Sequence, residues 1–291
     1  MATGVSIWNS IAPEFEVSFS NIDTFMAAGR QHGILGLINT LWTDDILVLM
    51  RPAFPGIAYG AAAAWQHGPM NRDHFFSDYA RIVYPASVAS EVAPGLAALL
   101  RAEVSLSRGV EGGTMRRLWD DPFFPPRLGT FRTHRDDLRQ ARLEAEEAQD
   151  HLSQALQHGG DHFSLGDLLL EARMLDYAAM KALYAAEIAD FWQQLGPHPS
   201  PDDVHFYLGS EIASHDHSRL ADLMDAIADL RTGYQKSWDE AYTPYRRGTV
   251  LARFEGEFQY WWNLQRRVNH LAAQFHKGDS LPPVETLSTE H

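Results

Sequence analysis

A tryptophan and two carboxylates directly follow an apolar run, and these side chains are the best candidates in the sequence for binding a ligand. Trp42 ends the run that begins at Ile34, and Asp44 and Asp45 come just after it. An indole face can stack on the apolar face of a pyranose ring, and a carboxylate accepts hydrogen bonds from sugar hydroxyls. The pattern predicts a carbohydrate subsite. The alternative is that Trp42 closes a hydrophobic core and that Asp44 or Asp45 caps the next turn.

Other titratable clusters lack the spacing that catalysis or metal binding requires. Asp239 and Glu240 are adjacent carboxylates, but they lie in a helical pattern with no strand before them, which is typical of a solvated helix end. His215 and His217 are two residues apart, so on a helix they would point about 200° away from each other and could not hold one metal ion. We therefore predict no catalytic residue, no metal site and no cofactor in this chain.

Two short apolar runs in the first seventy residues alternate with helical patterns. Residues 5–11 and 34–42 are predicted as buried strands, Asn21 is expected to cap a helix between them, and residues 57–66 form an alanine-rich helix after the second strand. This order predicts parallel strands with crossover helices. An eight-stranded barrel takes roughly 250 residues. Residues 1–70 are therefore predicted as the last two βα units of a TIM-barrel-type domain, and a ligand would bind beyond the carboxyl ends of their strands.

From residue 71 onward nearly every segment has helical spacing. Ser200 is followed by a proline and two acids, which predicts the start of a long helix that includes the apolar stripe from Leu220 to Trp238. The fold class is predicted as mainly α, with a partial (β/α) barrel end followed by an α-helical, bundle-like domain over residues 71–277 and a loose tail over 278–291. The other predicted helices cover residues 73–84, 88–106, 135–157, 164–195 and 249–275.

Composition excludes several classes of protein. The chain has 24 Lys and Arg residues against 38 Asp and Glu residues, a formal net charge of −14, so a nucleic acid or an anionic membrane surface would be repelled. The absence of cysteine excludes disulfides, thiolate catalysis and Cys-ligated zinc. No apolar run is long enough to span a membrane, and the first residues lack the pattern of a signal peptide. We expect a cytoplasmic location for the sequence as it stands.

The sequence resembles glycoside hydrolase family 20, the β-N-acetylhexosaminidases, over the end of their barrel and the helical C-terminal domain of some members. The resemblance implies that Trp42 forms an aromatic wall of the subsite for a terminal N-acetylhexosamine and that Asp44 binds outer hydroxyls of that sugar. The family usually has Glu at the second position, and Asp is about one methylene shorter. The residues that carry the resemblance are 28–29, 33–36, 41–44, 54–65, 238–244 and 250–254.

The resemblance does not extend to the catalytic residues. Family members use an adjacent Asp-Glu pair at the end of a middle strand, and a Tyr on the strand before the last one; here Trp8 and Asn9 end the preceding strand. The resemblance therefore implies the C-terminal portion of a glycoside hydrolase that is inactive alone, with an N-acetylhexosamine-containing carbohydrate, a missing barrel part or a second copy of the chain as partners. The alternative is a non-catalytic helical interaction or scaffold protein.

Overall fold

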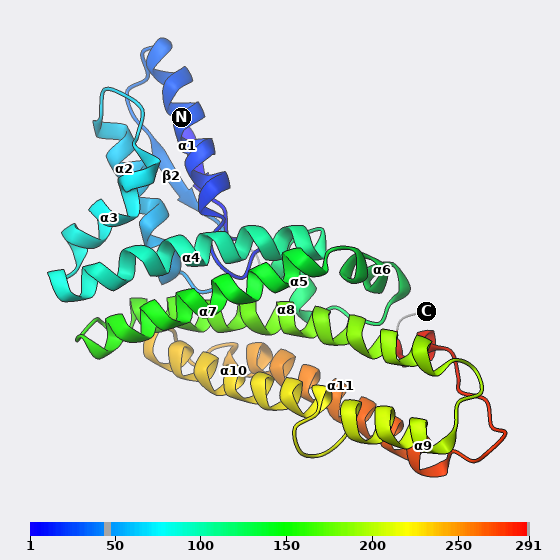
Figure 1. Cartoon of the computed structure of the whole chain (residues 1–291). Helices are drawn as coiled ribbons and strands as arrows, with labels where there is room; N and C mark the ends of the chain where they lie inside the picture. Colours follow the sequence, from blue (N-terminus) through cyan, green and yellow to red (C-terminus); the bar gives the residue numbers. More distant parts are fainter. Residues whose placement is uncertain (44–47, 290–291) are drawn as a thin grey trace. The chain divides into compact units, whose positions relative to one another are not determined.

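The computed structural model describes residues 1–43 and 48–289 and is 72% helical, which confirms the mainly α fold class (Figure 1). The chain divides into two compact units, which we call the N-terminal unit and the C-terminal unit. The N-terminal unit comprises Met1–Arg108, Gly112–Arg116 and Gln140–Asp176. The C-terminal unit comprises Gly109–Glu111, Arg117–Arg139 and Tyr177–His291. The predicted domain boundary at residue 70 therefore lies inside the N-terminal unit.

The N-terminal unit contains a parallel pair of strands, β1 (Ala2–Val5) and β2 (Ile38–Leu41), in which Ala2 pairs with Ile38. Helix α1 (Phe15–Gln31) connects them, and α2 (Phe54–Trp65) follows β2 after the short 3₁₀ turn η1 (Arg51–Ala53). The predicted order of strand, helix, strand and helix, and the parallel pairing, are confirmed. Whether these elements belong to a barrel stays a prediction.

The first strand lies over residues 2–5 and not over the predicted residues 5–11, because residues 6–11, most of them buried, are not paired to a neighbouring strand. Ile7 and Ile11 are in the core, which gave the segment the appearance of a strand. Its backbone amides instead donate to side chains: Ser6 N to Ser18 Oγ at 2.8 Å, and Ile11 N to Thr114 Oγ1 at 2.8 Å. Side-chain acceptors satisfy the buried backbone here in place of a strand ladder.

Helix α1 begins at Phe15, so the prediction that Asn21 caps this helix is wrong. The buried side chains Phe15, Phe19, Ile22 and Met26 follow helical spacing from the first turn onward. Asn21 lies within the helix, and its Oδ1 accepts a hydrogen bond from Gly4 N at 3.3 Å. The residue therefore ties α1 to β1.

The second strand, β2, was predicted to be buried, but it is partly exposed to solvent. Ile38 is 69% exposed, and no residue of β2 is fully buried. Within the described residues β2 pairs with β1 in a two-stranded sheet, so its other edge carries no strand. An apolar parallel strand normally has both faces covered.

The longer helices follow the sequence pattern closely. Helices α7 (Arg135–Gln157) and α8 (Ser164–Leu195) have the predicted bounds, and each contributes to both units. The remaining helices of the first half are α3 (Arg72–Val83), α4 (Ala86–Val110), α5 (Thr114–Trp119) and α6 (Pro125–Thr133). In the part of the chain that the structure describes, no helix combines the length and apolarity needed to cross a bilayer.

The single long helix predicted after Ser200 is divided in the structure. Ser200 does cap a helix, with its Oγ accepting from Asp203 N at 3.1 Å, but the short α9 (Pro201–Val204) continues as a π-helix, η2 (His205–Ile212). Ser218 then caps a new helix, α10 (Arg219–Ala241). A second capping residue inside the apolar pattern was the available signal for the break.

Helices α10 and α11 (Arg247–Gln274) lie side by side in the C-terminal unit (Figure 1). Residues 278–289, predicted as a loose tail, pack on this unit: Leu281 and Leu287 are buried, and Trp192 Nε1 donates to Pro282 O at 2.7 Å. The tail includes a 3₁₀ turn, η3 (Val284–Leu287).

Candidate functional site

Trp42 directly follows β2 and lies at the carboxyl end of the parallel strands, as the carbohydrate prediction requires. Its side chain is 58% exposed, and its Nε1 donates to Thr40 Oγ1 at 3.1 Å. Trp42 therefore does not close a core. Asp44 and Asp45 lie outside the described residues, so their part in the subsite stays a prediction.

The strand that carries Trp42 is held by side-chain hydrogen bonds to β1 and α2. Thr40 Oγ1 donates to Thr3 O at 2.6 Å, Thr3 Oγ1 donates to Asn39 Oδ1 at 3.0 Å, and Asn39 Nδ2 donates to Gly56 O at 3.2 Å. Gly56 allows α2 to approach closely, because a Cβ at this position would lie 2.7 Å from Val5 Cγ1. The indole therefore extends from a fixed strand end.

A second exposed indole follows β1. Trp8 comes three residues after β1 ends and is partly exposed, while the next residue, Asn9, packs against Gly113 and accepts from Met115 N at 3.3 Å. Because the strands are parallel, Trp8 and Trp42 both follow the carboxyl edge of the sheet. The sequence had marked Trp8 only as a departure from the family Tyr, and its exposure could not be read from the pattern.

Three buried acids in the N-terminal unit were missed by sequence reasoning. Glu103 Oε2 accepts from Ala12 N at 3.1 Å, and its Oε1 accepts from Thr114 Oγ1 at 2.6 Å, which fastens the segment after β1 to α4. Asp167 pairs with Arg51 at 2.9 Å. Glu171 is buried, and neither of its carboxyl oxygens has a hydrogen-bond partner among the described residues.

Burial makes two of these acids weak. Burial raises the pKa of Glu103 to about 8, against the hydrogen bonds from Thr114 and Ala12. Burial, together with the charges of Asp167 and Glu103, raises the pKa of Glu171 well above its ordinary value. Glu103 is therefore largely protonated at neutral pH, and Glu171 keeps its proton to a higher pH than an exposed glutamate does. Both side chains are closed off from solvent and do not reach a substrate. Glu103 positions the segment after β1 through Ala12 and Thr114.

The carboxylates and histidines that the sequence analysis excluded as catalytic or metal-binding groups lie on the surface of α10 and in the bend before it. Asp239 pairs with Arg247 at 2.7 Å near the end of α10, on a solvated surface as predicted. His215 and His217 lie in the bend between η2 and α10, so the helix assumed for them is absent. Within residues 1–43 and 48–289, no three His, Cys, Asp or Glu side chains are arranged to hold a metal ion.

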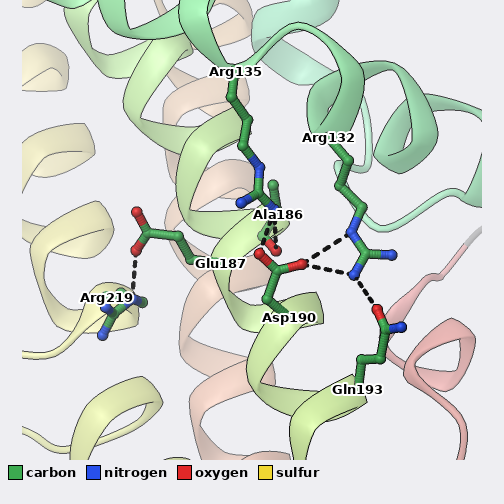
Figure 2. A network of polar contacts seen from close by, with 7 residues as sticks. All are labelled: Arg132, Arg135, Ala186, Glu187, Asp190, Gln193 and Arg219. Atoms are coloured by element: carbon green, nitrogen blue, oxygen red, sulfur yellow. Dashed lines mark hydrogen bonds and ion pairs between the residues drawn. The ribbon is translucent and has the colours of Figure 1, made fainter.

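A network of charged groups in the C-terminal unit has a structural role (Figure 2). Arg132 donates to Asp190 Oδ1 at 2.7 Å and to Gln193 Oε1 at 2.7 Å, and Arg135 donates to Asp190 Oδ2. Burial alone would raise the pKa of Asp190, but the hydrogen bonds and charges of Arg132 and Arg135 lower it. The carboxylate is thus paired on both oxygens, and it fixes α6 and the start of α7 to α8.

A hollow in the N-terminal unit lies between α2 and α3 and does not include Trp42 among its lining residues. It has a volume of about 540 Å³ and is lined by apolar and aromatic side chains such as Phe75, Tyr79 and Ile82. The candidate subsite is therefore defined by the strand ends and their indoles, and not by this hollow.

Comparison with known proteins adds no relative to these observations: no family model matches the chain, and no curated protein matches it.

Proposed function

We propose that this chain is the C-terminal portion of a family-20-like glycoside hydrolase and that Trp42 contributes to a subsite for a terminal N-acetylhexosamine. The observation that carries the proposal is the half-exposed indole of Trp42, fixed at the carboxyl end of a parallel strand by the hydrogen bonds of Thr40 and Asn39. Ligands of parallel α/β sheets bind at this edge. Trp8, at the same edge, supplies a second aromatic surface.

The uncovered surface of β2 supports the same proposal. Large apolar side chains are exposed to solvent around β2, a strand with one unpaired edge. They are Leu35 and Ile38, before and in β2, and Phe54 and Ile57, in α2. A parallel strand of this kind is stable when further strands continue the sheet. We propose that the occupant of this surface is a further βα unit of a barrel, which would also bring the carboxylate pair needed for hydrolysis.

The scaffold alternative expects Trp42 to be enclosed by bundle side chains. Its exposure favours the sugar subsite, and the uncovered strand edge is unlike the closed surface of a stable helical scaffold. The helical content alone is compatible with either function.

The test uses the indole N–H signals of ¹⁵N-labelled protein during titration with N-acetylglucosamine. We expect the Trp42 signal, assigned from the Trp42→Ala variant, to shift saturably, and the signal of Trp65, an indole 88% exposed at the end of α2, to stay in place. Trp65→Ala is the matched control and leaves the Trp42 response unchanged. A Trp42 signal that does not respond to N-acetylglucosamine or N-acetylgalactosamine refutes the subsite. The chain alone should not hydrolyse a chromogenic N-acetylglucosaminide, because no described carboxylate pair is placed to supply general acid catalysis.

A further inference from the structure

The C-terminal unit contains a groove of about 400 Å³ that lies away from the candidate subsite in sequence and belongs to one unit only. One face of α11 forms its floor, because Arg253, Gly256, Glu257 and Tyr260 recur at helical spacing. Trp119, Asp121 and Thr289 complete the lining used below.

Glu257 places an unused hydrogen-bond acceptor in this groove. The side chain is only 6% exposed, and its Oε1 accepts from Tyr177 Oη at 2.9 Å and from Trp261 Nε1 at 3.0 Å. Lys181 Nζ lies 2.8 Å from the same oxygen. Oε2 has no partner among the residues that the structure describes, and it is not one of the buried atoms closed off from solvent. Because Glu257 lines the groove, Oε2 is the oxygen that a ligand can reach.

Two of the carboxylates that line the groove, Glu257 and Asp120, are already paired with cations, which bears on the kind of ligand. The buried Lys181 balances Glu257. Asp120 pairs with Arg117 at 2.8 Å and with Arg127 at 3.1 Å. An ammonium ligand would therefore find neither of these two carboxylates without a cation.

Asp121 is also saturated, although by neutral donors. Its Oδ1 accepts from Phe123 N and Tyr260 Oη, both at 2.9 Å. Its Oδ2 accepts from Ser288 Oγ at 3.0 Å, from Thr289 N at 2.6 Å and from Thr289 Oγ1 at 2.9 Å. Burial would raise the pKa of Asp121, but these donors lower it, so the group stays a carboxylate with no free acceptor for a ligand.

The lining of the groove offers an aromatic surface with open space on the same helix face. The Tyr260 hydroxyl is used by Asp121, which leaves the aromatic ring as a wall. Gly256 adds no side chain to the floor, and a Cβ built there would meet no atom within 4 Å. Arg253 also lines the groove.

We propose that this groove binds a neutral, monosaccharide-sized polyhydroxyl ligand, with one hydroxyl donating to Glu257 Oε2 and an apolar ring face against Tyr260. A hydroxyl satisfies the free acceptor without bringing a charge into a site whose ion pairs are complete. The inference does not rest on the subsite at Trp42, because it uses other residues, another unit and another kind of wall.

The test fills the groove without touching its polar groups. Gly256→Leu puts a side chain into open space on a helix, and Gly248→Leu, on the same helix and also without a neighbour within 4 Å, is the matched control. Glucose and N-acetylglucosamine are titrated against the full chain carrying Trp42→Ala, which removes the other proposed site. We expect saturable shifts of the Trp119 or Trp261 indole signals, affinity weakened about tenfold or more by Gly256→Leu, and no change with Gly248→Leu.

Three outcomes would overturn the inference. The first is that neither sugar produces a saturable shift at Trp119 or Trp261. The second is that Gly256→Leu, with an unchanged melting temperature, leaves the affinity intact. The third is that free lysine occupies the groove in place of the sugars, which would show a cation site. Because all of these are read in the Trp42→Ala background, failure here leaves the subsite at Trp42 untouched, and failure at Trp42 leaves this result untouched.

Discussion

Glu103 in the N-terminal unit and Glu257 in the C-terminal unit are both buried glutamates on long helices, yet their partners differ in charge. Glu103 receives hydrogen bonds from Thr114 and Ala12 N, which are neutral groups. Glu257 lies 2.8 Å from the buried Lys181. A buried carboxyl takes its protonation state from its partners. The same residue type therefore gives a proton-holding acid in one unit and an ion pair in the other.

Removing the cation from the C-terminal pair should have the largest effect. Lys181→Met leaves Glu257 buried without a counter-ion, and we expect the free energy of unfolding, measured with urea, to fall by about 4 kcal/mol. The double variant Lys181→Met with Glu257→Gln should regain much of that loss. A single variant as stable as the wild type would show that Lys181 does not balance Glu257.

The N-terminal glutamate should make stability depend on pH in the opposite sense to an ordinary salt-bridged acid. Between its ordinary pKa of 4.5 and about 8, Glu103 binds a proton in the folded chain and has lost it in the unfolded chain. For this group stability should therefore be highest below pH 4.5 and fall by roughly 4 kcal/mol as the pH rises from 4.5 to 8.

Glu103→Gln is the control for this pH dependence, since an amide mimics the protonated acid and can still accept from Ala12 N. Urea unfolding at several pH values should show a flatter profile for this variant, with the residual slope due to groups such as Glu171. Identical slopes for wild type and Glu103→Gln would contradict a raised pKa at this residue.

The next prediction concerns the close packing of α2 on β1 at Gly56. Gly56→Ala should destabilise the N-terminal unit by about 1–3 kcal/mol, because its Cβ would lie 2.7 Å from Val5. Gly36→Ala, in the loop before β2 and with no neighbour within 4 Å, is the control in the same unit. Equal melting temperatures for Gly56→Ala and the wild type would show that α2 does not pack this closely on β1.

The smallest effect on stability is expected for Asp239, whose carboxylate is partly exposed. Asp239→Asn removes the pair with Arg247, in which both side chains are about 40% exposed, and we expect less than about 0.5 kcal/mol in the free energy of unfolding. A larger loss in a thermal melt would give Asp239 a role beyond the solvated surface predicted for it.

What the sequence predicted depended on local patterns. The bounds of α7 and α8, the cap at Ser200 and the parallel order of the strands all follow from spacing within one segment. The features that the sequence did not predict depend on contacts between residues far apart in the chain. Ala12 meets Glu103 across 91 residues, and this contact explains why the segment after β1 is buried without being a strand.

The two candidate sites also differ in how far local sequence could predict them. The position of Trp42 at a strand end was predicted from residues next to it, and its exposure is now observed, whereas Asp44 lies outside the described residues. The groove at Glu257 could not be predicted, because its acceptor is free only when Tyr177, Lys181 and Trp261 all occupy the other oxygen. No spacing within α11 shows which partners come from other helices.

The hydrogen bond from Thr289 N to Asp121 Oδ2 cannot form until the ribosome has made nearly the whole chain. The two residues are 168 positions apart. At about 5–20 residues per second, the ribosome makes Asp121 roughly 8–34 s before its last partner exists. During that interval Oδ1 can already accept from Phe123 N, whereas Oδ2, whose donors are Ser288 and Thr289, has only water. The groove wall that Asp121 organises is therefore completed late, after most of α8, α10 and α11 can already be helical.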